Sequence, residues 1–189
     1  MKIAIIGSAG RGMDQAYVTK TVWEKMVKKA LWIIRNHWEI PKEETNLISG
    51  GAAFADHVAV SLFLLEEADT LDLELPTTWD WGSKCFLDTG TQSPGRVANY
   101  WHRQFSKKIA PGRSENQSLE TLDSLLEHSR VSYRTYDGFK ARNLAVANCD
   151  RLIAFTFYDG NKPKPGSGTV HTWNNSVTTV KTHVNLFSL

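Results

Sequence analysis

The sequence has no long apolar run, few cysteines and almost no excess of charge of either sign. No stretch approaches the roughly 18 apolar residues that a membrane-spanning helix needs, so we expect no membrane association. The first apolar segment, residues 3–6, is too short for a secretory signal peptide. These absences together predict a cytoplasmic protein.

Only two cysteines are present, Cys85 and Cys149, and they lie far apart in the chain. No CxxC pair and no Cys/His ligand spacing occurs, so neither a disulfide-stabilised scaffold nor a structural metal site is indicated. Lys and Arg number 22 against 20 for Asp and Glu, which leaves a net charge of +2. Binding through a broad basic surface needs a larger excess, so we expect no nucleic-acid partner.

The composition that remains, 41% hydrophobic residues in a chain of 189, is enough for one folded domain with a real core. Short apolar runs that stop at glycine or proline alternate with segments of helical spacing. This order predicts right-handed βαβ units and a Rossmann-like, doubly wound, mainly parallel sheet of at least five strands. Strands are expected at 2–7, 47–49, 71–75, 151–157 and 183–187, and helices at 18–34, 52–67, 138–148 and 169–176.

Residues 77–130 interrupt this alternation. They contain two further helical segments, 97–108 and 118–128, and are too long for an ordinary connection. We therefore expect a helical insertion within the single domain, lying over the sheet. Its Trp81 and Trp101 offer rings that can stack on a nucleobase, although such residues more commonly pack an insertion onto its sheet.

A glycine-rich loop, residues 7–12, follows the first strand. Glycine lets a backbone approach an anion closely, and free amides at a helix N-terminus stabilise negative charge. No Gly-Lys-Ser/Thr follows, so the loop is not that of a P-loop ATPase, and its spacing is not that of a dinucleotide fingerprint. The candidate ligand-binding residues are Gly7, Ser8, Gly10 and Arg11.

A second glycine loop follows the strand at 47–49 and leads into a helix. Asp56 is expected one turn into that helix, where the helix dipole favours a carboxylate. Its functional alternative is to bind a ribose hydroxyl or to act as a general base. The candidate residues of this loop are Ser49, Gly50, Gly51, Ala52 and Asp56.

Two more candidate segments flank the strand at 151–157. Arg142, next to Asn143, offers a planar fork of donors for a phosphate, and its alternative is a salt bridge. Gly166, Ser167, Gly168 and Thr169 begin a helix, either as a phosphate-binding loop or as an ordinary N-cap. Because the carboxyl ends of parallel strands meet at one edge of a sheet, all these loops are expected to form one pocket.

These motifs, in this order, resemble the SLOG superfamily, which includes the lysine-decarboxylase-like LOG proteins and the Smf/DprA proteins. The best match is its YspA/YpsA-like branch, which has the loop SGGAxGAD and a later helix with RN. Phe54 stands where that loop often has glycine or another small residue. The resemblance covers residues 1–75 and 138–187 and rests on Gly7-Ser8, Ser49-Gly50-Gly51-Ala52 with Asp56, Arg142-Asn143 and Gly166-Ser167-Gly168-Thr169.

The resemblance implies a Rossmann-like protein that binds nucleotides or nucleotide-derived ligands, often as a homo-oligomer. LOG phosphoribohydrolases carry PGGxGTxxE with a catalytic glutamate. Thr172 occupies the glutamate position here, whereas the arginine that partners this motif has its counterpart in Arg142. The resemblance therefore implies that this chain keeps the ligand pocket of the LOG phosphoribohydrolases but lacks their catalytic glutamate.

Two functions of different classes follow as hypotheses. The first is binding or sensing of a nucleotide or nucleotide-derived phosphate ligand. The alternative is a hydrolase or transferase acting on the N-glycosidic bond of nucleoside 5′-monophosphates, with Asp56 or Asp14 as the catalytic carboxylate. Single-stranded DNA binding, as in the Smf/DprA proteins, needs a basic surface that the net charge does not indicate. No cofactor and no metal is expected.

Overall fold

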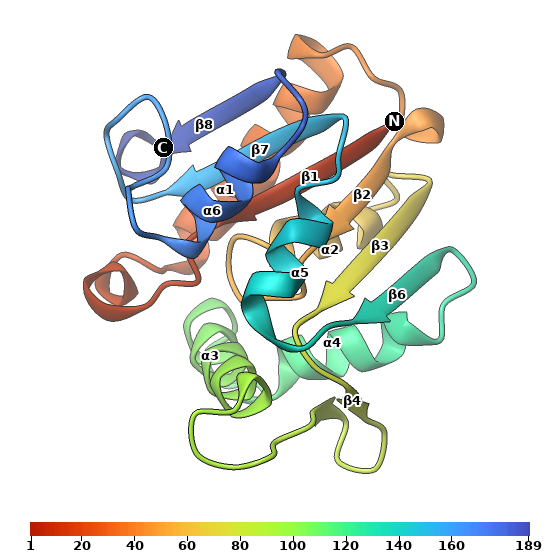
Figure 1. The fold of residues 1–189 in the computed structure, drawn as a ribbon. Coiled ribbons are helices and arrows are strands. Elements are labelled where there is room, and N and C mark those ends of the chain that lie inside the picture. The colour runs from red at the N-terminus through yellow and green to blue at the C-terminus, as the bar shows by residue number, and fades with distance from the viewer.

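The computed structural model describes residues 1–189 and contains one six-stranded parallel sheet (Figure 1). Its strand order is β6-β3-β2-β1-β7-β8, which confirms the predicted α/β, doubly wound, Rossmann-like class. The order reverses between β1 and β7, and this switch point is where such sheets bind ligands. The strands are β1 (Lys2–Gly7), β2 (Asn46–Ser49), β3 (Thr70–Leu75), β6 (Val131–Thr135), β7 (Arg151–Thr156) and β8 (Lys181–Asn185).

Helices cover both faces of the sheet. Helices α1 (Lys20–Trp32) and α2 (His57–Leu64) pack together on one face, and α5 (Gly138–Val146) and α6 (Gly168–Asn175) lie on the other (Figure 1). Strand β1 serves both layers, because its side chains alternate: Ile3 and Ile5 enter the larger core cluster, and Ile6 the smaller. A strand buried on both faces explains the uninterrupted apolar run at the N-terminus.

The predicted insertion at 77–130 is the connection between β3 and β6. It holds a short hairpin of β4 (Trp79–Asp80) and β5 (Cys85–Phe86), then helices α3 (Pro94–Ile109) and α4 (Gln117–Leu126). The two helices lie close to their predicted positions. The hairpin and β6 were not predicted, because β6 is a largely exposed edge strand and shows no apolar alternation.

The predicted helix at 52–67 begins late in the structure, at His57. Phe54 has a φ of 64°, outside the helical region, and the Ser49 hydroxyl closes the preceding loop. It donates to the Asp56 carbonyl at 2.9 Å and accepts from the Gly51 amide at 3.1 Å. Asp56 therefore precedes α2 and is not in its first turn, which corrects that expectation.

The last strand, β8, begins two residues earlier than predicted and ends at Asn185. The Asn185 side chain accepts the Phe187 amide at 2.9 Å and starts a 3₁₀ turn, so the chain leaves the sheet there. The remaining short helical turns are η1 (Gly12–Ala16), η2 (Ile33–His37) and η3 (Lys42–Glu44). No helix in the structure is both long and apolar enough to cross a bilayer.

Candidate functional site

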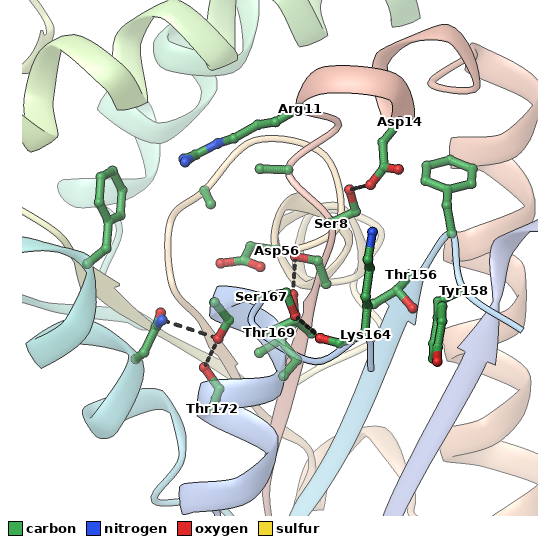
Figure 2. A pocket seen from close by; sticks show the side chains of 18 of the residues that line it. Ser8, Arg11, Asp14, Asp56, Thr156, Tyr158, Lys164, Ser167, Thr169 and Thr172 are labelled. Carbon is green, nitrogen blue, oxygen red and sulfur yellow. Dashed lines mark hydrogen bonds between the residues drawn. The ribbon is translucent and has the colours of Figure 1, made fainter. Parts of the chain in front are cut away.

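A cavity of about 500 Å³ lies at the carboxyl ends of β1 and β7, at the switch point of the sheet (Figure 2). Small-molecule sites typically have volumes of about 300–1,000 Å³. Ten predicted site residues line this cavity: Gly7, Ser8, Arg11, Ala52, Asp56, Arg142, Asn143, Ser167, Gly168 and Thr169.

Five other predicted site residues do not line the cavity: Gly10, Ser49, Gly50, Gly51 and Gly166. Gly10 and Gly51 have φ values of 69° and 64°, a conformation that favours glycine, and Gly10 donates its amide to the Ser8 hydroxyl at 3.0 Å. Gly10 and Gly51 therefore act on the site through the backbone conformation of their loops.

The loop after β1 is held close to its neighbours. A Cβ on Gly7 would collide with the carbonyl oxygen of Phe155 on β7, so only glycine fits at this crossing of strand and loop. The Ser8 hydroxyl donates to the Asp14 carboxylate at 2.6 Å, which ties the loop to η1. The Gly7 carbonyl accepts a bond from the Thr169 hydroxyl at 2.9 Å, which joins β1 to the start of α6.

The central feature of the site is an ion pair between Arg142 and Asp56. Arg142 Nη1 donates to Asp56 Oδ2 at 2.7 Å, and the two residues are 7% and 4% exposed. A Cβ on Gly50 would collide with Arg142 Nη1, so the absence of a side chain at Gly50 makes room for the pair. The two strongest candidates from the sequence are thus partners of each other, and both line the cavity.

Within this pair, the Asp56 carboxyl has a shifted pKa and Arg142 has hydrogen-bond donors without acceptors. Burial raises the pKa of the Asp56 carboxyl above its usual value, although Arg142 and the backbone amides of Ala52 and Gly7 counteract it. On Arg142, only Nη1 makes a hydrogen bond, and the buried Nε has no partner. A buried donor without an acceptor is costly, so an acceptor supplied to the Arg142 Nε would stabilise this arrangement.

Helix α6 begins at the cavity wall. The Ser167 hydroxyl accepts the Val170 amide at 3.1 Å and donates to the Lys164 carbonyl at 2.8 Å, so it is an N-cap and is already satisfied. The amides of Gly168 and Thr169 donate no hydrogen bond within the protein. Unpaired amides at the positive end of a helix dipole attract an anion at this point.

Several residues of the cavity were not identified from the sequence. They are Ile6, Ala9, Met13, Phe139, Thr156, Phe157, Tyr158 and Lys164. Thr156, Phe157 and Tyr158 end β7 or follow it directly, so the carboxyl-edge rule that located the glycine loops also applies to them. Lys164 lies further along the same loop, and no local pattern marks it.

The Thr156 hydroxyl is fixed by a histidine on β8. His183 Nε2 lies 2.7 Å from the Thr156 oxygen, and its Nδ1 lies 2.9 Å from the Gly160 carbonyl. A carbonyl only accepts, so Nδ1 carries the proton and the Thr156 hydroxyl donates to Nε2. Burial lowers the pKa of His183, which favours this neutral form.

The structure places neither Trp81 nor Trp101 in the cavity. Trp81 is exposed and lies edge-on to Tyr133, with ring centroids 6.4 Å apart. Trp101 packs against the core and lies 5.8 Å from the guanidinium carbon of Arg11. Base stacking by these tryptophans therefore has no support in the geometry, whereas Phe139, Phe157 and Tyr158 do line the cavity.

No protein-family model matches this chain, and no solved structure matches it. Among curated proteins, it is similar to "Uncharacterized protein R261" of Acanthamoeba polyphaga mimivirus. The two are 34% identical over 189 residues, an alignment that covers 98% of this chain and 96% of the viral protein. The chain therefore belongs to the same protein family as R261 of Acanthamoeba polyphaga mimivirus.

Proposed function

We propose that this protein binds a nucleotide or a nucleotide-derived phosphate ligand in the cavity between β1 and β7. The observation that carries the proposal is a set of cationic and amide donors that line one cavity and have no acceptor within the protein. The ammonium of Lys164, the guanidinium of Arg11 and the amides of Gly168 and Thr169 all lack acceptors at this cavity. Such donors fit phosphate oxygens, which accept several bonds at once.

The size and the apolar lining of the cavity favour a ligand larger than a free anion. Phe139, Phe157 and Tyr158 supply aromatic surface beside the cationic groups. Ligand pockets typically combine such surface with a few polar groups that fix orientation, and a nucleotide has a matching division into base and phosphate. We also propose membership of the SLOG superfamily, supported by the gathering of its four motif segments around one sheet edge.

Replacing Lys164 with alanine tests the proposal. We expect the affinity for adenosine 5′-monophosphate to fall roughly tenfold or more, because a charge-assisted bond to phosphate is lost. Lys162→Ala is the matched control, since Lys162 is an exposed lysine of the same loop that does not line the cavity. Isothermal titration calorimetry measures both. Equal affinities of the two variants for the nucleotide would show that Lys164 does not contact the phosphate.

The second candidate function is cleavage of the N-glycosidic bond of nucleoside 5′-monophosphates. One observation favours it: a carboxyl with a raised pKa, Asp56, lies in the wall of the cavity. Catalytic carboxyl groups are commonly found in such partly desolvated positions. Asp14 also lines the cavity, but it accepts the Ser8 hydroxyl at 2.6 Å and is thereby occupied in holding the loop.

Asp56→Asn tests this second candidate. If the protein is a glycosidase, the variant should release no free base from nucleoside 5′-monophosphates, because an amide cannot act as nucleophile or base. Its affinity for the intact nucleotide should stay within about tenfold of the wild type. Asp14→Asn is the control and should retain base release. Chromatographic assay of free base gives the readout, and activity of Asp56→Asn equal to the wild type would exclude Asp56 from catalysis.

A further inference from the structure

Arg11 places a positive charge at the mouth of the cavity without any acceptor. Its guanidinium carbon lies 5.4 Å from the ring centroid of Phe139 and 5.8 Å from that of Trp101. Two aromatic faces therefore hold the group in position and leave its N–H donors free. Trp101 belongs to α3, so the connection between β3 and β6 contributes to the site by holding Arg11.

Arg142 adds a second guanidinium to the same place. Its guanidinium carbon lies 5.7 Å from the ring of Phe139, the ring that Arg11 also contacts. Arg142 is 7% exposed, lines the cavity, and keeps a buried Nε without a partner. Partial burial and the neighbouring charge of Arg142 lower the pKa of Arg11. Asp56 compensates only one of these two positive charges, so a net positive charge remains that favours a bound anion.

A separate group of donors is formed by Lys164 and the start of α6. Lys164 follows β7 and lines the cavity, and the unpaired amides belong to Gly168 and Thr169. Figure 2 shows the side chains of Arg11 and Lys164 entering the cavity from different sides. Each of the two groups of donors fits one phosphate, because a phosphate oxygen accepts charge-assisted hydrogen bonds and each group offers several N–H donors.

We infer that the ligand carries two phosphate groups, one bound by Arg11 and Arg142 and the other by Lys164 and the amides of α6. This inference rests on the proposed function and specifies its ligand class. The two phosphates are either adjacent, as in a nucleoside diphosphate, or separated by a sugar, as in a nucleoside bisphosphate. Both kinds of ligand share the chemistry that the two groups of donors recognise.

Calorimetric titration with adenosine 5′-monophosphate, adenosine 5′-diphosphate and adenosine 3′,5′-bisphosphate tests the inference. We expect at least one of the two doubly phosphorylated nucleotides to bind tenfold or more tightly than the monophosphate. Arg11→Ala should reduce this advantage to about threefold or less, because the second phosphate loses a charge-assisted donor. Lys164→Ala should weaken the binding of all three. Whichever of the two ligands has the advantage identifies the spacing of the phosphates.

Arg113→Ala is the matched control for Arg11→Ala, because Arg113 is exposed and does not line the cavity. Inorganic phosphate and pyrophosphate, titrated in parallel, remove any dependence on the choice of base. Equal affinity for singly and doubly phosphorylated ligands, unchanged by Arg11→Ala, would overturn the two-phosphate inference while leaving the proposed function intact. Binding of none of the five probes would overturn the proposed function and this inference with it.

Discussion

Replacing Arg142 with alanine is expected to lower the free energy of unfolding by about 3–5 kcal/mol. It should also weaken nucleotide binding roughly tenfold to a hundredfold, because charge-assisted bonds to a phosphate are lost. The substitution leaves Asp56 as a buried carboxylate, 4% exposed, without the guanidinium that lies 2.7 Å away in the wild type. Removing one partner of a buried ion pair costs far more than the pair contributes, because the remaining charge stays desolvated. Urea unfolding monitored by circular dichroism measures the change.

Two further variants separate the structural role of Arg142 from its role in binding. Asp56→Leu combined with Arg142→Met replaces the pair with apolar side chains, and we expect this protein to be more stable than Arg142→Ala alone. This double variant should bind the nucleotide as weakly as Arg142→Ala does, because the guanidinium is still missing. Arg96→Ala, which removes an exposed ion pair with Asp88, should change stability far less. A double variant that binds as well as the wild type would make the pair purely structural.

The arrangement of the site was predictable where it depends on topology. A run such as residues 3–6, followed by glycine, marks a buried strand and the point where it ends. Once the sheet is parallel, every loop after a strand lies on one edge, which brings Gly7 and Gly168 to the same cavity. Arg142 was found from its place on the helix before β7, and it does line the cavity.

Features that depend on side-chain packing between distant segments were not predictable. Asp56 and Arg142 are 86 residues apart in the chain, and nothing local in either segment indicates that each is the other's partner. Strand β6 was missed because an exposed edge strand needs no apolar alternation. The hydrogen bond from His102 Nε2 to the Gly51 carbonyl, 2.9 Å long, likewise joins α3 to a loop 51 residues away.

Stability is expected to fall by several kcal/mol between pH 6.5 and pH 4.5, because two histidines are buried in neutral form. His57 and His102 are 5% and 0% exposed, and their ring centroids lie 6.0 Å apart. Burial lowers the pKa of His57 to about 3 and that of His102 to about 4, from an ordinary value of 6.5. The Nδ1 of His57 has no hydrogen-bond partner in this environment.

The sign of the effect follows from where the protons bind. Below pH 6.5 the unfolded chain takes up a proton at each histidine, whereas the folded protein stays neutral at both until the pH approaches 4. Each histidine therefore lowers the free energy of unfolding by about 1.4 kcal/mol for each pH unit of acidification. For two histidines over two pH units the loss is on the order of 5 kcal/mol. Asp56 has the opposite sign, since its raised pKa makes the folded state gain stability on acidification, but it is one group against two.

Substitution of one histidine separates this cause from general acid destabilisation. His102→Gln keeps an amide donor for the Gly51 carbonyl and removes one titrating group, so the fall in stability should be about half as steep. His37→Gln is the control, because His37 is exposed, and its pH dependence should match the wild type. Urea unfolding at pH 7.0, 5.5 and 4.5 gives the change of the free energy of unfolding with pH for each protein. These pH values span the range in which a histidine of the unfolded chain takes up its proton. If the free energy of unfolding of His102→Gln falls with pH as steeply as that of the wild type, protonation of His102 is not a cause of the acid destabilisation. Folded and unfolded wild-type protein would then bind protons equally at His102 over this pH range.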